Sequence, residues 1–292
     1  MCIEAKCNAD RLVIQYGMGA VRQPFLRLMP WQVSHDGQPV ILPRMGSITL
    51  NVQIGDSVYG MEGDHVEPGV SIKNPGAEEN NALNLLSCVG NSAVVLTGEA
   101  KGDRGFVTGS HGGVDHLLVY FPRETLEKMT LEDRVQIRMQ GRGMRIEGFE
   151  DSVHCIGLGP ELFEKLHITV EEGALIVPVA ARIPAHLMGS GMGEFSAAAG
   201  DYDIMTADRE EIRRLGLENL RYGDIVLLEN CDNTYGRGYL TGAVSVGVVV
   251  HGDCVLMGHG PGVSTLLSAK TPVLRGRVDR RANLADLMGV VK

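Results

Sequence analysis

Aromatic side chains and long apolar runs are scarce in this chain of 292 residues. Aromatic residues make up 5% of it, and there is a single Trp. No run approaches the roughly 18 apolar residues that a membrane-spanning helix needs, so we expect no membrane partner. The first dozen residues include Glu4, Lys6, Asp10 and Arg11 and contain no apolar core, which predicts no secretory signal. The sequence therefore predicts a cytoplasmic protein.

Blocks of basic residues are also lacking. The chain has 27 Lys and Arg residues against 36 Asp and Glu residues, a formal net charge of -9, and its Lys/Arg blocks are no longer than a pair. Neutralising phosphates requires a basic face. We therefore expect no nucleic-acid partner, and we expect a small molecule as substrate or ligand.

Cysteine is too thinly spread for a domain held together by disulfides. The six cysteines are scattered along the chain, and Cys2 and Cys7 are the one close pair. Their C-x4-C spacing has no second pair with which to complete a zinc site. We interpret the cysteines as reduced thiols.

Several established catalytic signatures are missing. The chain contains no G-x-S-x-G elbow, no Walker A loop, no H-E-x-x-H helix and no protein-kinase motif set. Gly189, Gly191 and Gly193 form G-x-G-x-G, but the final spacing and the surroundings do not fit a dinucleotide-binding unit. An anion cradle, a flexible lid and a close backbone contact all stay open for this segment.

Glycine, by contrast, is abundant, with 38 residues. This content, with few aromatics, is typical of many short strands joined by tight turns. We predict an α+β fold, predominantly β, with short strands in barrel-like or layered sheets and a few short helices. The expected strands are 12–16, 40–43, 48–54, 93–97, 117–121, 135–139, 174–179, 225–228, 243–250 and 255–257, and the expected helices are 78–88, 123–129, 160–166, 209–215 and 284–288.

One local pattern recurs at 124–137, 161–176 and 211–226: an amphipathic helical turn, an acidic turn and an apolar strand. The pair Gly55-Asp56 echoes Gly223-Asp224 within it. The aspartate can close the turn on neighbouring backbone amides. We place a domain boundary in the glycine-rich stretch 141–159, which gives a β-rich part with long loops at 1–150 and a barrel-like part at 151–292. A single intertwined domain is the alternative.

Two glycine-bounded loops concentrate potential metal ligands. The loop 63–69 combines two acids with an imidazole, and the segment 109–116 is the densest ionisable cluster in the chain. Carboxylate and imidazole side chains that converge in such loops can hold a divalent metal ion. The alternative for the first loop is a solvated acidic turn. The predicted metal ligands are Asp64, His65, His111, Asp115, His116 and His259.

Candidate catalytic groups lie in the C-terminal half. Asp201 and Asp203 are two residues apart, so on a strand they share a face and can serve as metal ligand and general base. Tyr235 opens the run YGRGY, in which Arg237 suits a substrate carboxylate. His251, which follows an apolar strand, stands either at a site or in a hairpin turn.

Four motifs together carry a family resemblance: GDHVEPGVSI at 63–72, GSHGGVDH at 109–116, YGRGY at 235–239 and GHGPG at 258–262. With these motifs the chain resembles a bacterial family catalogued as a domain of unknown function, number 4438. The resemblance implies a β-rich fold with a barrel-like part. It implies no catalytic residues.

These patterns lead to a working hypothesis of a metal-assisted hydrolase that acts on an amide or cyclic C–N bond of a small metabolite. A divalent metal ion would activate water, Asp201 or Asp203 would accept the proton, and Arg237 would hold a substrate carboxylate. Two alternatives stay open: a non-catalytic small-ligand-binding or assembly protein, and a metal-free lyase or isomerase that uses a His/Asp pair. We expect a homo-oligomer, because short strands leave edges to be covered.

Overall fold

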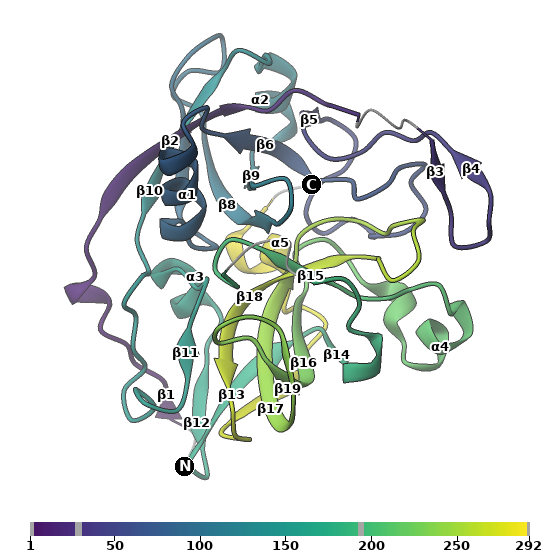
Figure 1. Cartoon of the computed structure of the whole chain (residues 1–292). Helices are drawn as coiled ribbons and strands as arrows, with labels where there is room; N and C mark the ends of the chain where they lie inside the picture. Colours follow the sequence, from purple (N-terminus) through teal and green to yellow (C-terminus); the bar gives the residue numbers. More distant parts are fainter. Residues whose placement is uncertain (1–2, 27–30, 192–195, 291–292) are drawn as a thin grey trace.

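The structure, a computed structural model, describes residues 3–26, 31–191 and 196–290. Strands dominate it and the helices are few and short, so the predicted α+β fold is confirmed (Figure 1). Cys2 and Gly193 lie outside the described residues. The described cysteines form no disulfide with one another. None of the described helices combines the length and apolar character needed to cross a membrane.

A closed six-stranded barrel forms the N-terminal body. Its strands follow the order β2, β10, β7, β8, β9 and β6, and β6 pairs back with β2 to close the ring. Alternation along β10 turns Val135, Ile137 and Met139 into the barrel core. The short strand β5 (Ile48–Thr49) pairs antiparallel with the start of β6. The bounds of the barrel strands are β2 (Gln15–Val21), β6 (Gly69–Lys73), β7 (Ser92–Val95), β8 (Arg104–His111), β9 (His116–Tyr120) and β10 (Arg134–Met139).

Two further sheets form the C-terminal body. The larger has the order β11-β18-β17-β16-β14, with β15 attached to β18, and the smaller has the order β1-β12-β13-β19. The hairpin β3-β4 stands apart from both. The bounds are β1 (Ile3–Glu4), β3 (Gln32–Val33), β4 (Pro39–Val40), β11 (His154–Cys155), β12 (Thr169–Glu171), β13 (Ala174–Val179), β14 (Ala181–Ile183), β15 (Asp201–Asp203), β16 (Ile225–Asp232), β17 (Gly238–Val249), β18 (Gly262–Ala269) and β19 (Leu274–Val278).

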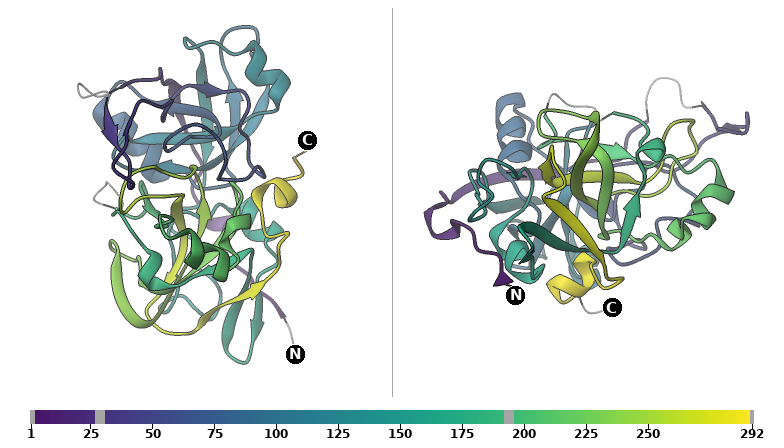
Figure 2. Two further views of the ribbon diagram at one scale, coloured as in Figure 1. Left: turned by 90° about the vertical axis from the view of Figure 1, so that its right-hand side faces the viewer. Right: turned by 90° about the horizontal axis from the view of Figure 1, so that it is seen from below.

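The two bodies are stacked on one another, the barrel above the C-terminal sheets in the left view of Figure 2. The end of β8 meets β18, where Ser110 N donates to Ser264 Oγ at 3.1 Å and Ser264 Oγ donates back to Ser110 O at 2.8 Å. One buried apolar cluster runs across this seam and joins Leu118 of the barrel to Leu266 of the lower sheet. The seam therefore has a solid core on which loops from both bodies are held.

All five predicted helices are present, within two residues of the expected ends. Local capping explains where some of them begin and end: Asp208 accepts hydrogen bonds from two backbone amides at the start of α4, and the left-handed Gly289 ends α5. The bounds are α1 (Ala77–Leu86), α2 (Arg123–Lys128), α3 (Pro160–Lys165), α4 (Arg209–Arg214) and α5 (Leu284–Met288).

The recurring acidic turn is also as expected. Asp133 Oδ2 accepts from Thr130 N at 2.7 Å just before β10, and Asp224 Oδ2 accepts from Arg221 N at 2.8 Å just before β16. Asp56 closes the same kind of turn on Gln53 N at 2.8 Å. In each case the carboxylate bonds the amide three residues earlier, which turns the chain into the next extended segment.

One predicted strand is wrong, and the predicted strands 12–16, 40–43 and 48–54 overlap β2, β4 and β5 at two residues or fewer. Residues 255–257 form bends and turns in the connection between β17 and β18, not a strand. The apolar run Val255–Met257 is three residues long, and the neighbouring backbone bonds hold it as a loop: Val255 O accepts from His35 N at 2.7 Å, while His259 N bonds back to Leu256 O at 3.3 Å. This connection supplies part of the site described next.

Candidate metal centre

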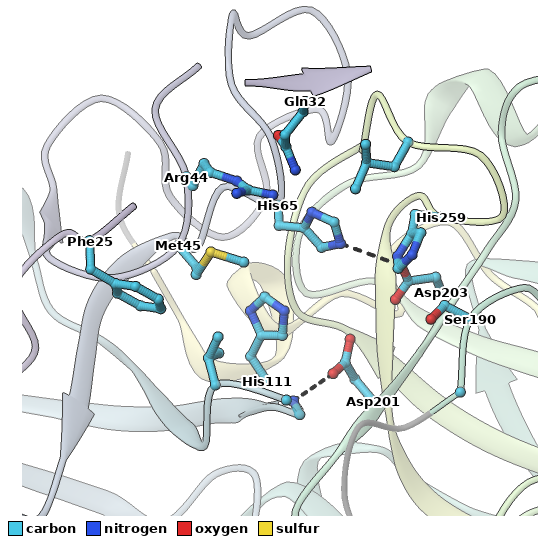
Figure 3. A pocket seen from close by; sticks show the side chains of 15 residues that line it. Phe25, Gln32, Arg44, Met45, His65, His111, Ser190, Asp201, Asp203 and His259 are labelled. Carbon is cyan, nitrogen blue, oxygen red and sulfur yellow. Dashed lines mark hydrogen bonds and ion pairs between the residues drawn. The ribbon is translucent and has the colours of Figure 1, made fainter. Parts of the chain in front are cut away.

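A cavity of about 340 Å³ opens at the seam between the two bodies (Figure 3). Its walls come from the segment before β6, the β8-β9 turn, β15 and the β17-β18 connection. Backbone bonds tie two of these segments together: His65 N donates to Asp253 O at 3.2 Å, and Gly252 N donates to Val66 O at 2.9 Å. His65 itself has a left-handed backbone with φ of 53°. Residues distant in sequence are thereby fixed against one another.

Three buried imidazoles meet at this point: His65, His111 and His251. They can each offer one nitrogen so that all three nitrogens lie within 4.8 Å of one another. The rings of His111 and His251 are stacked with centroids 4.3 Å apart, and the ring of His65 lies 4.9 Å from that of His251. This is the spacing of side chains that share one small ligand.

Each of these imidazoles has its Nδ1 atom engaged from outside the cluster. His251 Nδ1 donates to the carbonyl oxygen of Gly252 at 2.9 Å, His111 Nδ1 to Glu67 Oε1 at 2.6 Å, and His65 Nδ1 to Asp64 Oδ1 at 3.2 Å. A proton on Nδ1 leaves the lone pair of a neutral ring on Nε2. Histidines that bind metals are commonly oriented in this way by carboxylates and backbone carbonyls.

Two carboxylates on β15 complete the cluster. Asp201 and Asp203 point to the same side of the strand, as their spacing predicts, while Tyr202 between them is fully buried in the core. His251 Nε2 lies 2.8 Å from Asp201 Oδ2 and 3.6 Å from Asp203 Oδ1, and His65 Nε2 lies 3.6 Å from Asp203 Oδ2. Gly112 N donates to the other Asp201 oxygen at 2.7 Å and fixes that side chain.

The contact between His251 and Asp201 tests whether these residues suit a cation. His251 Nε2 is buried and makes no aligned hydrogen bond, although the Asp201 oxygen is close. A lone pair on Nε2 would repel this oxygen, so the contact requires either a proton on Nε2 or a metal ion between the two atoms. Ligands about 2.1 Å from a metal ion lie about 3.0 to 3.4 Å from each other, and the distances given above bracket that range. The donor set therefore fits a divalent metal.

Gly262 provides the room for this contact. It is the first residue of β18 and pairs with Asp203. A Cβ atom at this position would lie 2.1 Å from Asp201 Oδ2 and 2.2 Å from His251 Nε2. Since no side chain can be placed at such distances, glycine is required for these donor atoms to face each other.

Glu67 is the buried anchor behind the cluster. Its carboxylate accepts from Gly46 N, Ser71 Oγ and the Nδ1 atoms of His111 and His116. Burial alone raises the pKa of this carboxyl, but the two imidazoles and their hydrogen bonds outweigh it and hold the pKa well below its usual range. An ionised Glu67 thus keeps the proton of His111 on Nδ1.

The pKa values of the two stacked imidazoles are shifted in opposite directions. Burial and the neighbouring His251 lower the pKa of His111, which favours the neutral form that metals bind. Burial also lowers the pKa of His251, but Asp201 and Asp203 outweigh it and raise that pKa well above its usual value. The two carboxylates thus favour positive charge at His251, and burial disfavours it at His111.

His259 and Cys254 lie at the edge of the cluster. His259 Nδ1 bonds Asp203 Oδ2 at 2.7 Å, and its side chain is partly open to the cavity. Cys254 is buried, and burial together with Asp64 raises the pKa of its thiol. With His65 these two residues form a further group whose ligand atoms lie within 4.8 Å of one another.

The predicted site residues fall into three groups: those at the cavity, those buried behind His65 or Glu67, and those that do not line the cavity. His65, His111, Asp201, Asp203 and His259 line the cavity. Asp64 is fully buried behind His65, where it accepts from Nδ1 of that ring. His116 lies behind Glu67, fully buried, with its Nδ1 on that carboxylate. Asp115, Tyr235 and Arg237 are not among the described residues that line the cavity.

The last three have other partners. Asp115 sits in the β8-β9 turn, where its carboxylate accepts from Lys73 Nζ at 2.8 Å. Arg237 donates to the carbonyl oxygen of Met188. Tyr235 is 83% exposed, and its ring centroid lies 6.2 Å from that of His154.

Two residues of the cluster are absent from the predicted ligand set. The sequence leaves His251 open between a site and a hairpin turn, and it predicts Glu67 only as part of an acidic loop. The available signal lies in the strands: an imidazole two residues after the long apolar strand β17 and a carboxylate two residues before β6 both sit where a strand meets the seam.

Comparisons with known proteins agree with this fold. Two family models match the chain: Domain of unknown function (DUF4438), N-terminal, over residues 31–164, and its C-terminal counterpart over residues 165–288. The chain belongs to the DUF4438 family. This DUF4438 protein is similar to the crystal structure of TM1086, with 45% sequence identity and a TM-score of 0.91, over 97% of this chain and 99% of that one. The comparison with curated proteins gives no match. The family resemblance read from the four motifs is confirmed.

Proposed function

We propose that this DUF4438 protein is a metal-dependent hydrolase that cleaves an amide or cyclic C–N bond of a small molecule. One observation carries the proposal. Three buried imidazoles, each with Nδ1 bonded from behind, surround one point beside the carboxylates of Asp201 and Asp203. Three protein ligands with room for a further one are typical of catalytic zinc sites.

Some of these residues would bind the metal ion, and another would accept a proton. A divalent ion held by the three imidazoles would lower the pKa of a water molecule and polarise a carbonyl group. Asp203 is best placed to accept the proton, because its carboxylate lies beside both His65 and His251 and is oriented by His259. Asp201 is held by Gly112 N and by its contact with His251, which suits a ligand.

The experiment that tests the proposal is metal analysis of untagged protein by inductively coupled plasma mass spectrometry, before and after treatment with a chelator. We expect near-stoichiometric metal in the wild type, and its loss in His251→Ala. His186→Ala is the matched control, because His186 is an exposed imidazole paired with Glu211. A wild type that neither contains nor takes up zinc, manganese or nickel would contradict the proposal.

Activity is then tested on the metal-loaded protein with a panel of small amides and lactams. Asp203→Asn keeps a polar side chain of the same size but removes the base, so hydrolysis should fall by about two orders of magnitude or more, while the metal content stays close to that of the wild type. Hydrolysis that survives in Asp203→Asn would assign the proton transfer to another group.

A second candidate is a metal-free lyase or isomerase that uses His251 and Asp201 as an acid–base pair. The raised pKa of His251, caused by the two carboxylates that outweigh its burial, favours this candidate. Full activity of chelator-treated protein would select it over the hydrolase.

A further inference from the structure

Arg44 brings a permanent positive charge into the candidate metal centre. It lines the same cavity as His65, His111 and Asp203, and it is the one Lys or Arg among the described lining residues. Its side chain is 12% exposed. A guanidinium so nearly buried needs an acidic partner or a ligand.

The backbone on both sides of Arg44 is fixed to the segment that carries His65. Pro43 O accepts from Asp64 N at 2.9 Å, and Gly46 N donates to Glu67 Oε2 at 2.7 Å. Arg44 therefore keeps a constant position relative to the imidazole cluster. Such rigidity is what a group that orients a substrate requires.

The side chain of Arg44 is held from one edge. Its Nε donates to Asp64 Oδ2 at 3.0 Å, while the other oxygen of Asp64 accepts from His65 Nδ1. The two terminal nitrogens of Arg44 form no hydrogen bond with the residues that the structure describes. Figure 3 shows the guanidinium beside Gln32 and His65, at the wall of the cavity.

The free edge of a guanidinium matches a carboxylate, which can accept two parallel N–H bonds. Apolar side chains of Phe25, Met45 and Leu256 line the same cavity and suit a short carbon chain or ring. These features describe a small acid whose carboxylate lies away from the bond that reacts.

We infer that the substrate carries a carboxylate, that Arg44 binds this group, and that the scissile C–N bond is thereby placed at His65, His111 and His251. This inference rests on the proposed function and names its substrate class. Asp64 connects the carboxylate-binding group to the candidate metal centre, because it orients both Arg44 and His65.

The test uses hydroxamates, which chelate a protein-bound metal through the same head group whatever their tail. Binding of butyrohydroxamate and of succinic monohydroxamate to the zinc-loaded protein is measured by isothermal titration calorimetry, together with valerohydroxamate and glutaric monohydroxamate. Within each pair the tail ends in a methyl group or in a carboxylate. For at least one pair we expect the acid to bind about tenfold more tightly or better, as for a hydrogen-bonded charge pair.

Three variants locate the effect. In Arg44→Gln the acid should bind no more tightly than the neutral hydroxamate of its pair, while the neutral hydroxamates bind as before. Arg44→Lys keeps the positive charge but not the two parallel N–H donors, so the difference in affinity between acid and neutral hydroxamate should shrink. Arg182→Gln, in which an arginine near Glu229 in the lower sheet is removed, should behave like the wild type. Zinc content is measured for each variant to show that the centre has formed.

The outcomes separate the two proposals. Neutral hydroxamates that fail to bind the zinc-loaded protein would contradict the proposed metal centre itself. Neutral hydroxamates that bind as well as both acids would leave the metal centre intact and overturn the carboxylate inference. An advantage for the acid that persists in Arg44→Gln would overturn the role of Arg44.

Discussion

The imidazole of His111 stacks on that of His251, with ring centroids 4.3 Å apart and planes inclined by 26°. Two positively charged rings would repel each other in this position. The opposite pKa directions of the pair, lowered for His111 and raised for His251, show how the surrounding carboxylates resolve the conflict. Within the stacked pair, Asp201 and Asp203 therefore favour positive charge on His251 and not on His111.

Glu67 should control metal affinity without touching the metal. In Glu67→Gln the buried charge that orients His111 is lost, so we expect the dissociation constant for zinc to rise about 10- to 100-fold, as for other residues that orient metal ligands. Competition with a chromophoric chelator measures this change. Glu127→Gln, at an exposed ion pair with Arg123, is the control and should leave the constant unchanged. Equal affinities in both variants would show that His111 needs no such support.

Gly262→Ala should weaken metal binding although it removes no ligand. The added methyl group would collide with the donor atoms of Asp201 and His251 and force them apart. Overpacking of this kind typically costs about 1–3 kcal/mol, or roughly 5- to 150-fold in affinity. Gly238→Ala is the control, because Gly238 also begins a strand, also lacks a positive φ, and has only an ordinary contact, Asp232 O at 3.5 Å, at its Cβ position. Normal zinc affinity in Gly262→Ala would contradict the proposed arrangement.

Substitutions of Asp115 and Tyr235, which lie outside the cavity, should leave metal binding unchanged. Asp115 pairs with Lys73 at a half-exposed site, and Tyr235 is largely exposed. Asp115→Asn and Tyr235→Phe should each change the free energy of unfolding by no more than about 0.5 kcal/mol and should keep the zinc content of the wild type. Loss of metal in either variant would return that residue to the ligand or catalytic set expected from sequence.

Glu211 should make stability depend on pH in the acid range. Its two hydrogen bonds to Arg214, with His186 beside it, lower its pKa from 4.5 to about 2. Because the folded-state pKa lies below the unfolded value, the stabilisation is complete above pH 4.5 and is lost as the pH falls towards 2. The difference in thermal unfolding midpoint between the wild type and Glu211→Gln should therefore be largest near neutral pH and narrow in acid.

The control for that measurement is Glu210→Gln on the same helix, because Glu210 makes no ion pair with the described residues. The difference in thermal unfolding midpoint between Glu210→Gln and the wild type should not narrow in acid in the same way. A pH-independent difference for Glu211→Gln would mean that the ion pair with Arg214 adds nothing to stability.

Cys155 should resist alkylation in the native protein. Burial, with Cys7 and Cys88 nearby, raises the pKa of its thiol to about 12. At pH 8 only about one thiol in ten thousand would then be ionised, and the thiolate is the reactive form. Mass spectrometry after iodoacetamide treatment should find Cys155 modified in the denatured chain only. Rapid labelling of the folded protein would contradict this protected setting.

The parts of the fold that the sequence predicts are the locally determined ones. Helix α3 begins at Pro160, α4 is capped by Asp208, and Asp133 closes its own turn, so each signal lies within a few residues of the structure it causes. Strand pairing is different. The pairings of β6 with β2 and of β15 with β18 are long-range contacts. They cannot be predicted from the sequence of either strand alone.

The candidate site shows the same division. Asp201 and Asp203 could be assigned to one face from their spacing, because alternation along a strand is a local rule. Proximity in sequence also predicts that Asp115 acts together with His116. The turn between β8 and β9 instead gives Asp115 a left-handed backbone with φ of 56°, and its carboxylate accepts from Lys73. The place of His251 depends on the packing of β17 and β18 against the barrel, which only the assembled fold specifies.

The seam between the barrel and the lower sheets also sets the order in which the protein can mature. His65 and His111 are synthesised with the barrel, whereas His251 and the β18 strand that backs it follow later in the sequence. A growing polypeptide that has not yet reached β18 thus carries an incomplete set of donors. Metal capture would then follow the folding of both bodies during biogenesis.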